Sequence, residues 1–244
     1  MKESTAKQLL KSVKESYNQI ANEFSDTRNY SWEEFKYFKP YLFENAEIVD
    51  LGCGNGRLIE FLNSYYLGQP YHYIGIDNSE GLLKNAQKKY QKQIFLPGDQ
   101  LDVPLAENQA DLIFNIAAFH HIPSKKLRIE ALEQMHKALK PGGKLIITVW
   151  MLFQKKYWLA NLKAWLKFIY TFGAYSPTDL MIDWKNGQKE ILAKRYYHSF
   201  LPWELKKLIK KAGFIIEEDF SVKKGKKTNF LKAYNYCIVA QKNE

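Results

Sequence analysis

Apolar residues recur at helical spacing through the first forty residues of the chain. Residues 5–24 place leucine, valine, tyrosine, isoleucine and phenylalanine three or four positions apart, which predicts one amphipathic helix. Residues 31–41 place Trp32, Phe35 and Phe38 on one face of a second, shorter helix. The sequence therefore predicts a helical segment ahead of the rest of the fold.

From residue 46 onward, short apolar runs alternate with amphipathic segments. The runs predict strands at 47–51, 71–77, 93–99, 110–119 and 144–150. The amphipathic segments predict helices at 57–66, 79–90 and 124–140, with Ser79 as an N-cap and Pro141-Gly142-Gly143 ending the third helix. Strands separated by helices imply right-handed crossovers and a parallel sheet covered on both faces.

The pattern changes after Trp150. Residues 151–184 contain nine aromatic residues and no clear strand–helix unit, so we expect a lid of one or two helices. Order returns with a helix at 201–213, which begins near Pro202 and is capped by Gly213. Two strands at 214–222 and 234–242 follow, joined by a basic turn.

These elements predict one α/β domain with a Rossmann-like, mostly parallel, seven-stranded sheet and helices on both faces. Its last strand is expected to be antiparallel, an edge arrangement known in mixed sheets. We divide the domain into an N-terminal helical segment, a cofactor-binding core, an aromatic lid that forms a substrate insertion, and a C-terminal helix with a hairpin. Their expected bounds are 1–45, 46–150, 151–200 and 201–244.

Composition narrows the setting of this domain. The chain is 46% apolar and 25% charged, which suits a packed globular core. The longest apolar run is too short to span a membrane, so no membrane insertion is expected, and residues 1–17 lack the apolar core of a signal peptide. Cys53 and Cys237 form no CxxC pair, which favours a reducing, cytoplasmic location.

The positive charge is confined to one part of the chain. Residues 1–150 hold 18 basic and 18 acidic residues, whereas residues 151–244 hold 18 basic and 8 acidic ones. The whole net charge of +10 therefore lies in the second part. This excess favours a polyanionic partner or, equally, a solvated lysine face.

A glycine loop directly follows the first predicted strand. Gly52, Gly54 and Gly56 have the spacing GxGxG, and Arg57 stands where a dinucleotide fingerprint needs a third small residue. Asp50 precedes the loop. A carboxylate there would repel a pyrophosphate and attract a cationic amino-acid group.

Two further carboxylates end the next two strands. Asp77 lies 21 residues after Gly56, which fits an acceptor for ribose hydroxyls, and Asp99 could accept from an adenine amine. Three carboxylates at successive strand ends suit a ligand that is cationic and carries ribose and adenine.

These features resemble the class I S-adenosylmethionine-dependent methyltransferases. The resemblance covers residues 46–150 through DLGCGNG, IGIDNS, PGD, ADLIFNIAAFHHI and LKPGGKLIITVW, in that order. It implies S-adenosylmethionine as the cofactor. The residues expected to bind it are Asp50, Gly52, Cys53, Gly54, Asn55, Gly56, Asp77, Asn78, Asp99 and Asn115.

The flanks of the core are similar to a narrower family, the methyltransferases that esterify the carboxymethyl group of a tRNA wobble uridine. Tyr17-Asn18-Gln19-Ile20-Ala21 and its continuation to Arg28 carry the resemblance, as does Arg195-Tyr196-Tyr197-His198. Residues 151–185 depart from that family. The resemblance implies tRNA as a partner and raises the question of a small zinc-binding activator protein.

A carboxylate acceptor needs no general base, because it is already ionised near neutral pH. The site then needs alignment and a cation to seat the carboxylate, for which Arg28 and Arg195 are candidates, with a structural salt bridge as the alternative for each. His120 and His121 follow the fourth core strand; we expect one to line the pocket and no metal to be bound. The expected substrate contacts are Tyr17, Arg28, Tyr197 and His198.

Two other functions remain open at this stage. An O- or C-methyltransferase of small molecules would also use an aromatic lid. A noncatalytic RNA- or partner-binding module could retain the nucleoside pocket, although the intact acidic and glycine positions argue against it.

Overall fold

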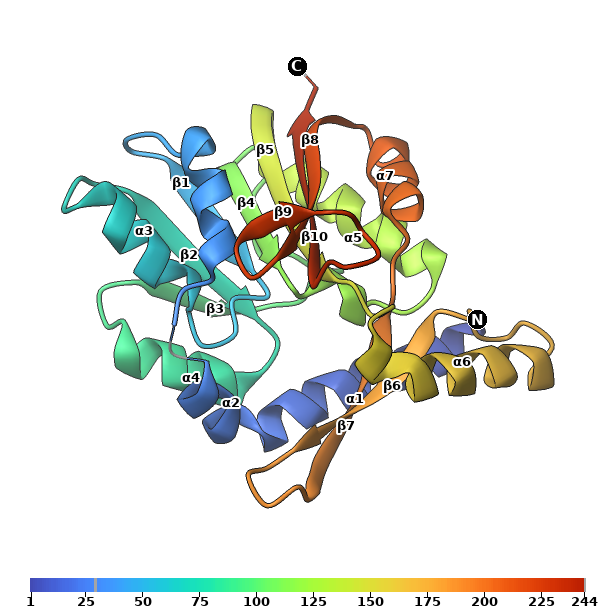
Figure 1. Cartoon of the computed structure of the whole chain (residues 1–244). Coiled ribbons are helices and arrows are strands. Elements are labelled where there is room, and N and C mark those ends of the chain that lie inside the picture. The colour runs from blue at the N-terminus through green and yellow to red at the C-terminus, as the bar shows by residue number, and fades with distance from the viewer. Residues whose placement is uncertain (29, 244) are drawn as a thin grey trace.

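A computed structural model describes residues 1–28 and 30–243 of the chain (Figure 1). The helices are α1 (Glu3–Gln19), α2 (Ala21–Thr27), α3 (Leu58–Tyr66), α4 (Glu80–Lys89), α5 (Lys125–Ala138), α6 (Trp158–Tyr170) and α7 (Pro202–Lys211), with short 3₁₀ helices η1 (Glu33–Tyr41), η2 (Phe119–His121) and η3 (Lys155–Tyr157). The strands are β1 (Glu47–Leu51), β2 (His72–Asp77), β3 (Ile94–Pro97), β4 (Ala110–Ile116), β5 (Leu139–Trp150), β6 (Asp179–Lys185), β7 (Ile191–His198), β8 (Phe214–Lys223), β9 (Lys226–Thr228) and β10 (Asn235–Lys242).

The central sheet has the strand order β3-β2-β1-β4-β5-β10-β8-β9. Strands β1 to β5 are parallel, and β10 pairs antiparallel with both β5 and β8. The mostly parallel α/β sheet with an antiparallel last strand is therefore confirmed. Two details differ from expectation: β9 adds an eighth strand, and β10 lies inside the sheet instead of at its edge.

Each face of the sheet is covered by its own apolar core. On one face, Val49, Ile113 and Ile147 pack with buried residues of α5 and α7. On the other, Ile48 and Phe114 pack with buried residues of α3, α4 and η1. Alternate strand residues face opposite sides of a sheet, so these buried strands read as continuous apolar runs.

Several predicted bounds shift for identifiable reasons. The helix expected over 5–24 is broken at Ile20, a fully buried residue, and continues as α2. The helix expected to reach residue 140 ends at Ala138, because Leu139 already pairs with Ala110 as part of β5. The segment expected as a helix over 31–41 is the 3₁₀ helix η1, which contains Pro40.

The prediction for residues 151–184 was only half right. One helix, α6, is present, but β6 and β7 form a separate two-stranded antiparallel sheet. This hairpin packs on α1, where Ile20, Trp184 and Ala193 make a small buried cluster. In Figure 1, α1, α2 and the hairpin lie together below the sheet, and α6 projects to one side. Within the described residues, no helix has both the length and the apolar character to cross a membrane.

Candidate active site

A pocket opens where β1, β2 and β4 end. Its walls come from the glycine loop, the segments after β2, β3 and β4, and the N-terminal helices α1 and α2. Predicted residues on its walls are Tyr17, Arg28, Asp50, Gly52, Cys53, Gly54, Asn55, Asp77, Asn78, Asp99 and His121. Ligand sites of open α/β sheets lie at this edge, where successive crossovers diverge.

The glycine loop folds back on the end of β2. The Gly52 and Cys53 amides donate to the Ile76 carbonyl at 2.7 and 3.0 Å. Gly52 has φ +82°, and a Cβ on it would lie 2.4 Å from the Ala118 Cβ, so only glycine suits this turn. The turn brings the backbone of the loop to the pocket wall.

Asp77 is already held in place by backbone amides. Its carboxylate accepts from the Gly54 amide and the Ser79 amide, each at 2.8 Å. Burial raises the pKa of this carboxyl, and the backbone hydrogen bonds oppose that rise. The remaining acceptor capacity at this strand end suits paired hydroxyl groups.

The other two carboxylates complete an acidic wall. Burial raises the pKa of Asp50 to about 7, and the Tyr73 hydroxyl donates to it at 2.9 Å. Asp99 accepts from the Asn78 amide group at 2.9 Å. A cationic ligand on this wall would favour the ionised form of Asp50.

Arg57, which stands where a dinucleotide fingerprint would need a third small residue, lies on the pocket wall beside Asp50. Its guanidinium stacks over Trp32 at 5.3 Å, and burial lowers its pKa to about 10, with the charge of Arg28 adding to the effect. Asp50 and Arg57 together match the ammonium and carboxylate of a zwitterionic amino-acid group. The acidic wall and this pair therefore fit S-adenosylmethionine, whose cationic groups, ribose and carboxylate each find a partner there.

Arg28 and Arg195 form a basic part of the site, called here the basic wall, and Arg28 lies next to the glycine loop, where its carbonyl accepts from the Asn55 amide group at 3.3 Å. The Arg28 guanidinium lies 5.3 Å from the Trp184 ring, and the Arg195 guanidinium lies 4.8 Å from the same ring. Arg28 lines the pocket, whereas Arg195 is buried behind Tyr17, to whose hydroxyl it donates at 3.1 Å. Neither arginine forms an ion pair with an acid in the part of the chain that the structure describes. The Arg28 guanidinium is therefore available to an anionic ligand, whereas Arg195 reaches the pocket only through Tyr17.

The two adjacent histidines lie in different surroundings, one on the pocket wall and one behind it. His121 lines the pocket, and its Nδ1 donates to the Tyr196 carbonyl at 2.7 Å. This leaves Nε2 to accept from the Tyr17 hydroxyl at 2.9 Å. His120 is fully buried behind it and accepts from the Trp150 amide at 3.2 Å. Burial lowers the pKa of His121 to about 3 and that of His120 well below its usual value, so both are neutral near pH 7.

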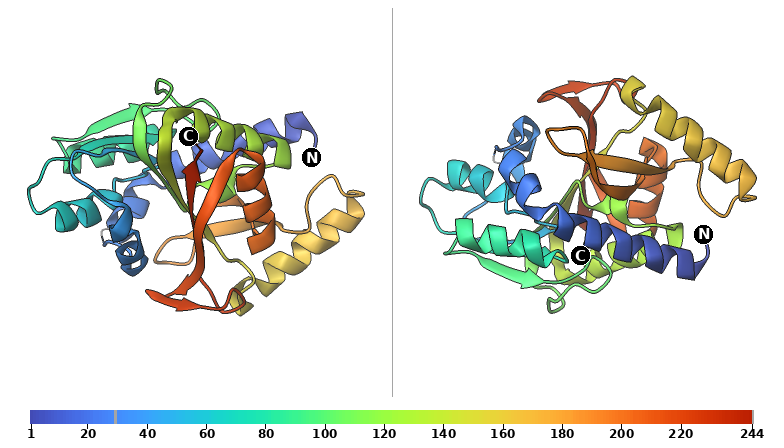
Figure 2. Two further views of the ribbon diagram at one scale, coloured as in Figure 1. Left: turned by 90° about the horizontal axis from the view of Figure 1, so that it is seen from above. Right: turned by 90° about the horizontal axis from the view of Figure 1, so that it is seen from below.

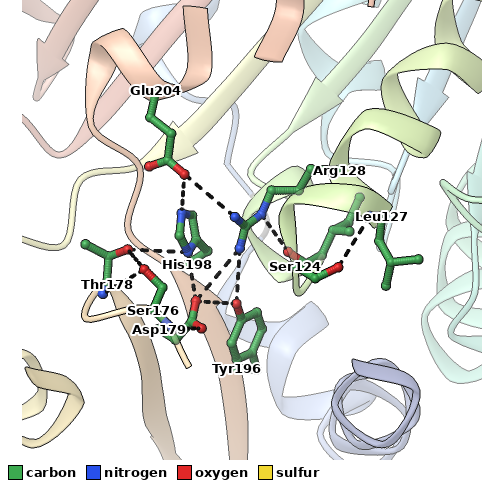
Figure 3. A network of polar contacts seen from close by, with 10 residues as sticks. Ser124, Leu127, Arg128, Ser176, Thr178, Asp179, Tyr196, His198 and Glu204 are labelled. Atoms are coloured by element: carbon green, nitrogen blue, oxygen red, sulfur yellow. Dashed lines mark hydrogen bonds and ion pairs between the residues drawn. The ribbon is translucent and has the colours of Figure 1, made fainter. Parts of the chain in front are cut away.

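Besides Arg195 and His120, four predicted site residues lie off the pocket wall. Gly56 is buried in the loop, and the Asn115 amide group donates to the Leu51 carbonyl at 3.0 Å. Tyr197 is buried against Trp150. His198 belongs to a separate buried network with Asp179, Glu204, Arg128 and Tyr196, drawn in Figure 3.

No group of three or more side chains suited to hold a metal ion occurs in the described parts of the chain. The two pocket walls therefore offer carboxylates, guanidinium groups and aromatic rings as their binding chemistry.

Replacing Asp77 by alanine should weaken binding of S-adenosylhomocysteine by about 1.5–3 kcal/mol, because hydrogen bonds to a charged group are lost. Isothermal titration calorimetry measures the affinity. The matched control is Asp102→Ala, since Asp102 is an exposed carboxylate that does not line the pocket. Unchanged affinity in a folded Asp77→Ala protein would remove Asp77 from the site.

Comparisons with known proteins agree with this geometry. The profile of a methyltransferase domain matches residues 49–147. The chain is 28% identical over 250 residues to the tRNA (carboxymethyluridine(34)-5-O)-methyltransferase of Schizosaccharomyces pombe, covering 95% of this chain and 96% of that protein. A protein named as a methyltransferase in Encephalitozoon cuniculi is 31% identical, covering 81% of this chain and 84% of its own length.

A mouse relative, tRNA (carboxymethyluridine(34)-5-O)-methyltransferase ALKBH8, is 32% identical over 145 residues, or 59% of this chain. The aligned region is only 21% of that protein, so the chain spans about a fifth of its length.

Two solved structures share the fold. The S-adenosylmethionine-dependent methyltransferase of Methanosarcina mazei superposes with a TM-score of 0.66 and 21% identity, covering 85% of this chain and 97% of that one. A Haloferax volcanii methyltransferase, solved with its Trm112 methyltransferase activator, has a TM-score of 0.64 and 16% identity, covering 96% and 98%.

Proposed function

The chain belongs to the S-adenosylmethionine-dependent methyltransferase family, and we propose that it methylates a carboxylate, the carboxymethyl group of a tRNA wobble uridine. The observation that carries this proposal is the charge of the pocket lining. Asp50, Asp77 and Asp99 line the pocket as an acidic wall, and Arg28, with Arg195 behind Tyr17, adds a basic wall that forms no ion pair in the described chain. The relatives named as tRNA (carboxymethyluridine(34)-5-O)-methyltransferases support the same acceptor.

The residues have separate tasks in this proposal. Bound S-adenosylmethionine supplies a methyl group activated on a sulfonium. Asp77 holds the ribose hydroxyls, and Asp50 with Arg57 holds the amino-acid group. Arg28 seats the acceptor carboxylate, and Tyr17 is fixed between Arg195 and His121 as a second contact. Trp32 and Trp150 line the pocket and exclude water from the aligned groups.

The acceptor oxygen needs no proton removed, because a carboxylate is ionised near pH 7. With the methyl donor bound, a carbon–oxygen bond would form as the carbon–sulfur bond breaks, and the donor would be released as a neutral thioether. The neutral His121 therefore serves in positioning, through its two hydrogen bonds.

The direct test is incubation with labelled methyl donor and tRNA that carries carboxymethyluridine. We expect a labelled nucleoside that releases its label as methanol in mild alkali, as a methyl ester does. Label that is stable to alkali, or label found only in a small-metabolite extract, would instead support the alternative of an O- or C-methyltransferase of small molecules. No methyl transfer with either acceptor would favour a noncatalytic module.

The pH profile gives an independent check. The rate at saturating substrate should be flat between about pH 5.5 and 8, because burial keeps the pKa of His121 near 3 and the bound cationic donor favours the ionised form of Asp50, whose pKa without it is about 7. Initial rates in a constant-ionic-strength buffer series measure this. A titration near pH 6.5 that disappears in His121→Gln would contradict the proposal and indicate an acceptor that must lose a proton.

The basic turn between β8 and β9 is the proposed binding surface for tRNA phosphates. Of its lysines, Lys227 pairs with Glu218 at 2.7 Å, whereas Lys223, Lys224 and Lys226 form no ion pair in the described structure. Changing all four to glutamine should weaken tRNA binding and lower its salt dependence by roughly 0.7–0.9 for each phosphate that is no longer neutralised. Filter binding over a salt series measures both quantities.

The control for this variant is Lys84→Gln with Lys88→Gln on α4. That helix packs beside β3, at the opposite edge of the sheet from β9 (Figure 1). If the quadruple variant binds tRNA as the wild type does, the turn is only a solvent-exposed lysine surface and does not bind tRNA.

The proposal also includes a cellular location and a partner protein. The free, buried Cys53 and Cys237 suit a reducing cytoplasm. The structural neighbour from Haloferax volcanii was solved with its Trm112 activator, and a corresponding activator is proposed as a partner to be tested by adding it to the methylation assay.

A further inference from the structure

Helix α6 turns its large apolar side chains away from the protein. Of its residues only Ala164 is buried, and Ala160 and Asn161 are half-buried on the same side. The exposed large apolar residues of this segment are Trp158, Leu159, Leu162, Trp165, Leu166, Phe168, Ile169, Tyr170 and Phe172. Small residues thus face the body and large ones face outward, the reverse of an ordinary surface helix.

The outward residues form one continuous stripe. Trp158, Leu162, Trp165 and Ile169 follow one another at three or four positions, so they share a side of the helix. Side chains at this spacing lie opposite the buried Ala164. Exposed apolar patches of this kind mark an interaction surface.

The charged residues of this segment have a single sign. Residues 151–178 contain four lysines, Lys155, Lys156, Lys163 and Lys167, and no acidic residue. Lys163 and Lys167 follow one another on the helix flank, between the outward stripe and the body. Both views of Figure 2 show α6 along the outer edge of the molecule.

We propose that α6 docks the protein on an anionic lipid bilayer. The helix lies in the interface, its outward stripe enters the boundary between headgroups and acyl chains, and its flanking lysines meet lipid phosphates. Basic helices with tryptophan and leucine on the apolar side bind membranes in this way. With 13 residues, α6 is shorter than the ~20 residues a spanning helix needs, so it lies on the membrane without crossing it. This inference does not depend on the acceptor of the methyl group.

The surface fits a bilayer better than it fits other occupants. A second copy packed two-fold on α6 would set Lys163 and Lys167 against the same lysines, with no acid in the segment to pair with them. Interfaces between proteins are also depleted in lysine. RNA would stack on aromatic rings, but Leu162, Leu166 and Ile169 occupy the middle of the stripe and offer no ring.

Flotation with lipid vesicles tests the proposal. The full chain should float with vesicles of phosphatidylcholine mixed with phosphatidylglycerol and float much less with phosphatidylcholine alone. Trp165→Ser combined with Leu166→Ser should lower the partition coefficient at least ~10-fold, because two large apolar side chains leave the interface. Lys163→Gln with Lys167→Gln should lower it by a further ~10-fold or more, since each lysine near an anionic surface contributes about 1 kcal/mol.

Trp203→Ser is the matched control, since Trp203 is an exposed tryptophan on α7 and should leave flotation unchanged. Methyl transfer to tRNA in solution should be the same for the Trp165/Leu166 variant and the wild type, which separates this proposal from the enzymatic one. Failure of the wild type to float overturns it. Two other outcomes would also overturn it: a wild-type chain that dimerises without lipid, or one that binds tRNA but does not float, if the Trp165/Leu166 variant loses that dimerisation or that tRNA binding.

Discussion

Replacing Arg28 by alanine is expected to lower kcat/KM for the tRNA acceptor by about 100- to 1000-fold, the usual cost of removing one preorganised electrostatic contact. The guanidinium lines the pocket and stacks on Phe24 and Trp184 at 5.8 and 5.3 Å. It forms no ion pair within the described chain, so its charge is free to meet the substrate carboxylate. Single-turnover rates at varied tRNA concentration measure the loss.

The affinity for S-adenosylhomocysteine should stay within about twofold of wild type in this variant. Arg57→Ala is the matched comparison, because Arg57 lies on the same pocket beside Asp50 and should lose affinity for the methyl donor instead. Arg28→Lys should fall between, since lysine keeps the charge but lacks the planar fork and the stacking. If Arg28→Ala weakens donor binding as much as Arg57→Ala, Arg28 belongs to the donor's carboxylate.

The acidic wall of the pocket could be predicted because its signals are local. β1 has the predicted bounds, and Ser79 caps α4 by accepting from the Leu82 amide. Parallel strands place their carboxyl ends at one edge, so Asp50 and Asp77 had to come together once the strands were identified. Short-range patterns that repeat along the chain are sufficient for this part of the site.

The β6–β7 hairpin was missed although the sequence carries its signal. Leu180, Ile182 and Trp184 alternate with polar or exposed residues, and Asn186-Gly187 is a sequence signal for a hairpin, which the structure connects through the loop 186–190. The helical expectation for residues 151–184 rests on the lack of a clear strand–helix unit, although the many aromatic residues of this stretch favour strands. The alternation at the end of that stretch was the better guide.

Other features depend on contacts between distant parts of the chain and could not be read from a pattern. The basic wall joins Arg28 after α2 with Arg195 on β7 through Trp184 on β6. The placement of His198 away from the pocket depends on Asp179 and Glu204, which approach it from two different segments. Only the folded structure shows which of these charges are already compensated.

The buried network of Figure 3 ties the hairpin to the core. Asp179 accepts from His198 Nδ1 at 2.8 Å and from the Tyr196 hydroxyl at 2.6 Å. His198 Nε2 lies 2.9 Å from Glu204, and Arg128 lies between the two acids, 3.8 Å from Asp179 and 3.7 Å from Glu204. Both histidine nitrogens face carboxylates, which only accept, so the ring donates from both. Two positive and two negative groups balance in this network.

The network also helps to position His121 on the pocket wall. The Tyr196 carbonyl is the acceptor for His121 Nδ1, and Arg195 and Tyr197 flank Tyr196 on β7. A change at Asp179 should therefore act on the active site through β7, without touching substrate.

Asp179→Asn is accordingly expected to destabilise the folded protein by about 3–5 kcal/mol, because Arg128 and His198 then lack a buried counter-charge. The melting temperature should fall by about 10 °C or more for a chain of this size. Asp183→Asn is the control, since Asp183 is exposed on the same strand and should leave stability within about 0.5 kcal/mol. Urea unfolding monitored by tryptophan fluorescence measures both variants.

The pH dependence of the free energy of unfolding distinguishes the loss of a charge from a packing defect. Burial raises the pKa of Asp179, but the hydrogen bond and charge of His198, together with the hydrogen bonds from Tyr196 and the Ser176 amide, outweigh it, so the pKa is lowered overall, as is that of Glu204. A lowered pKa in the folded state stabilises above the unfolded value of about 4 and is lost as pH falls below it. The stability gap between wild type and Asp179→Asn should therefore be full at pH 6–7 and shrink below about pH 4. A gap that stays constant down to pH 3 would contradict this assignment, because a packing defect does not titrate.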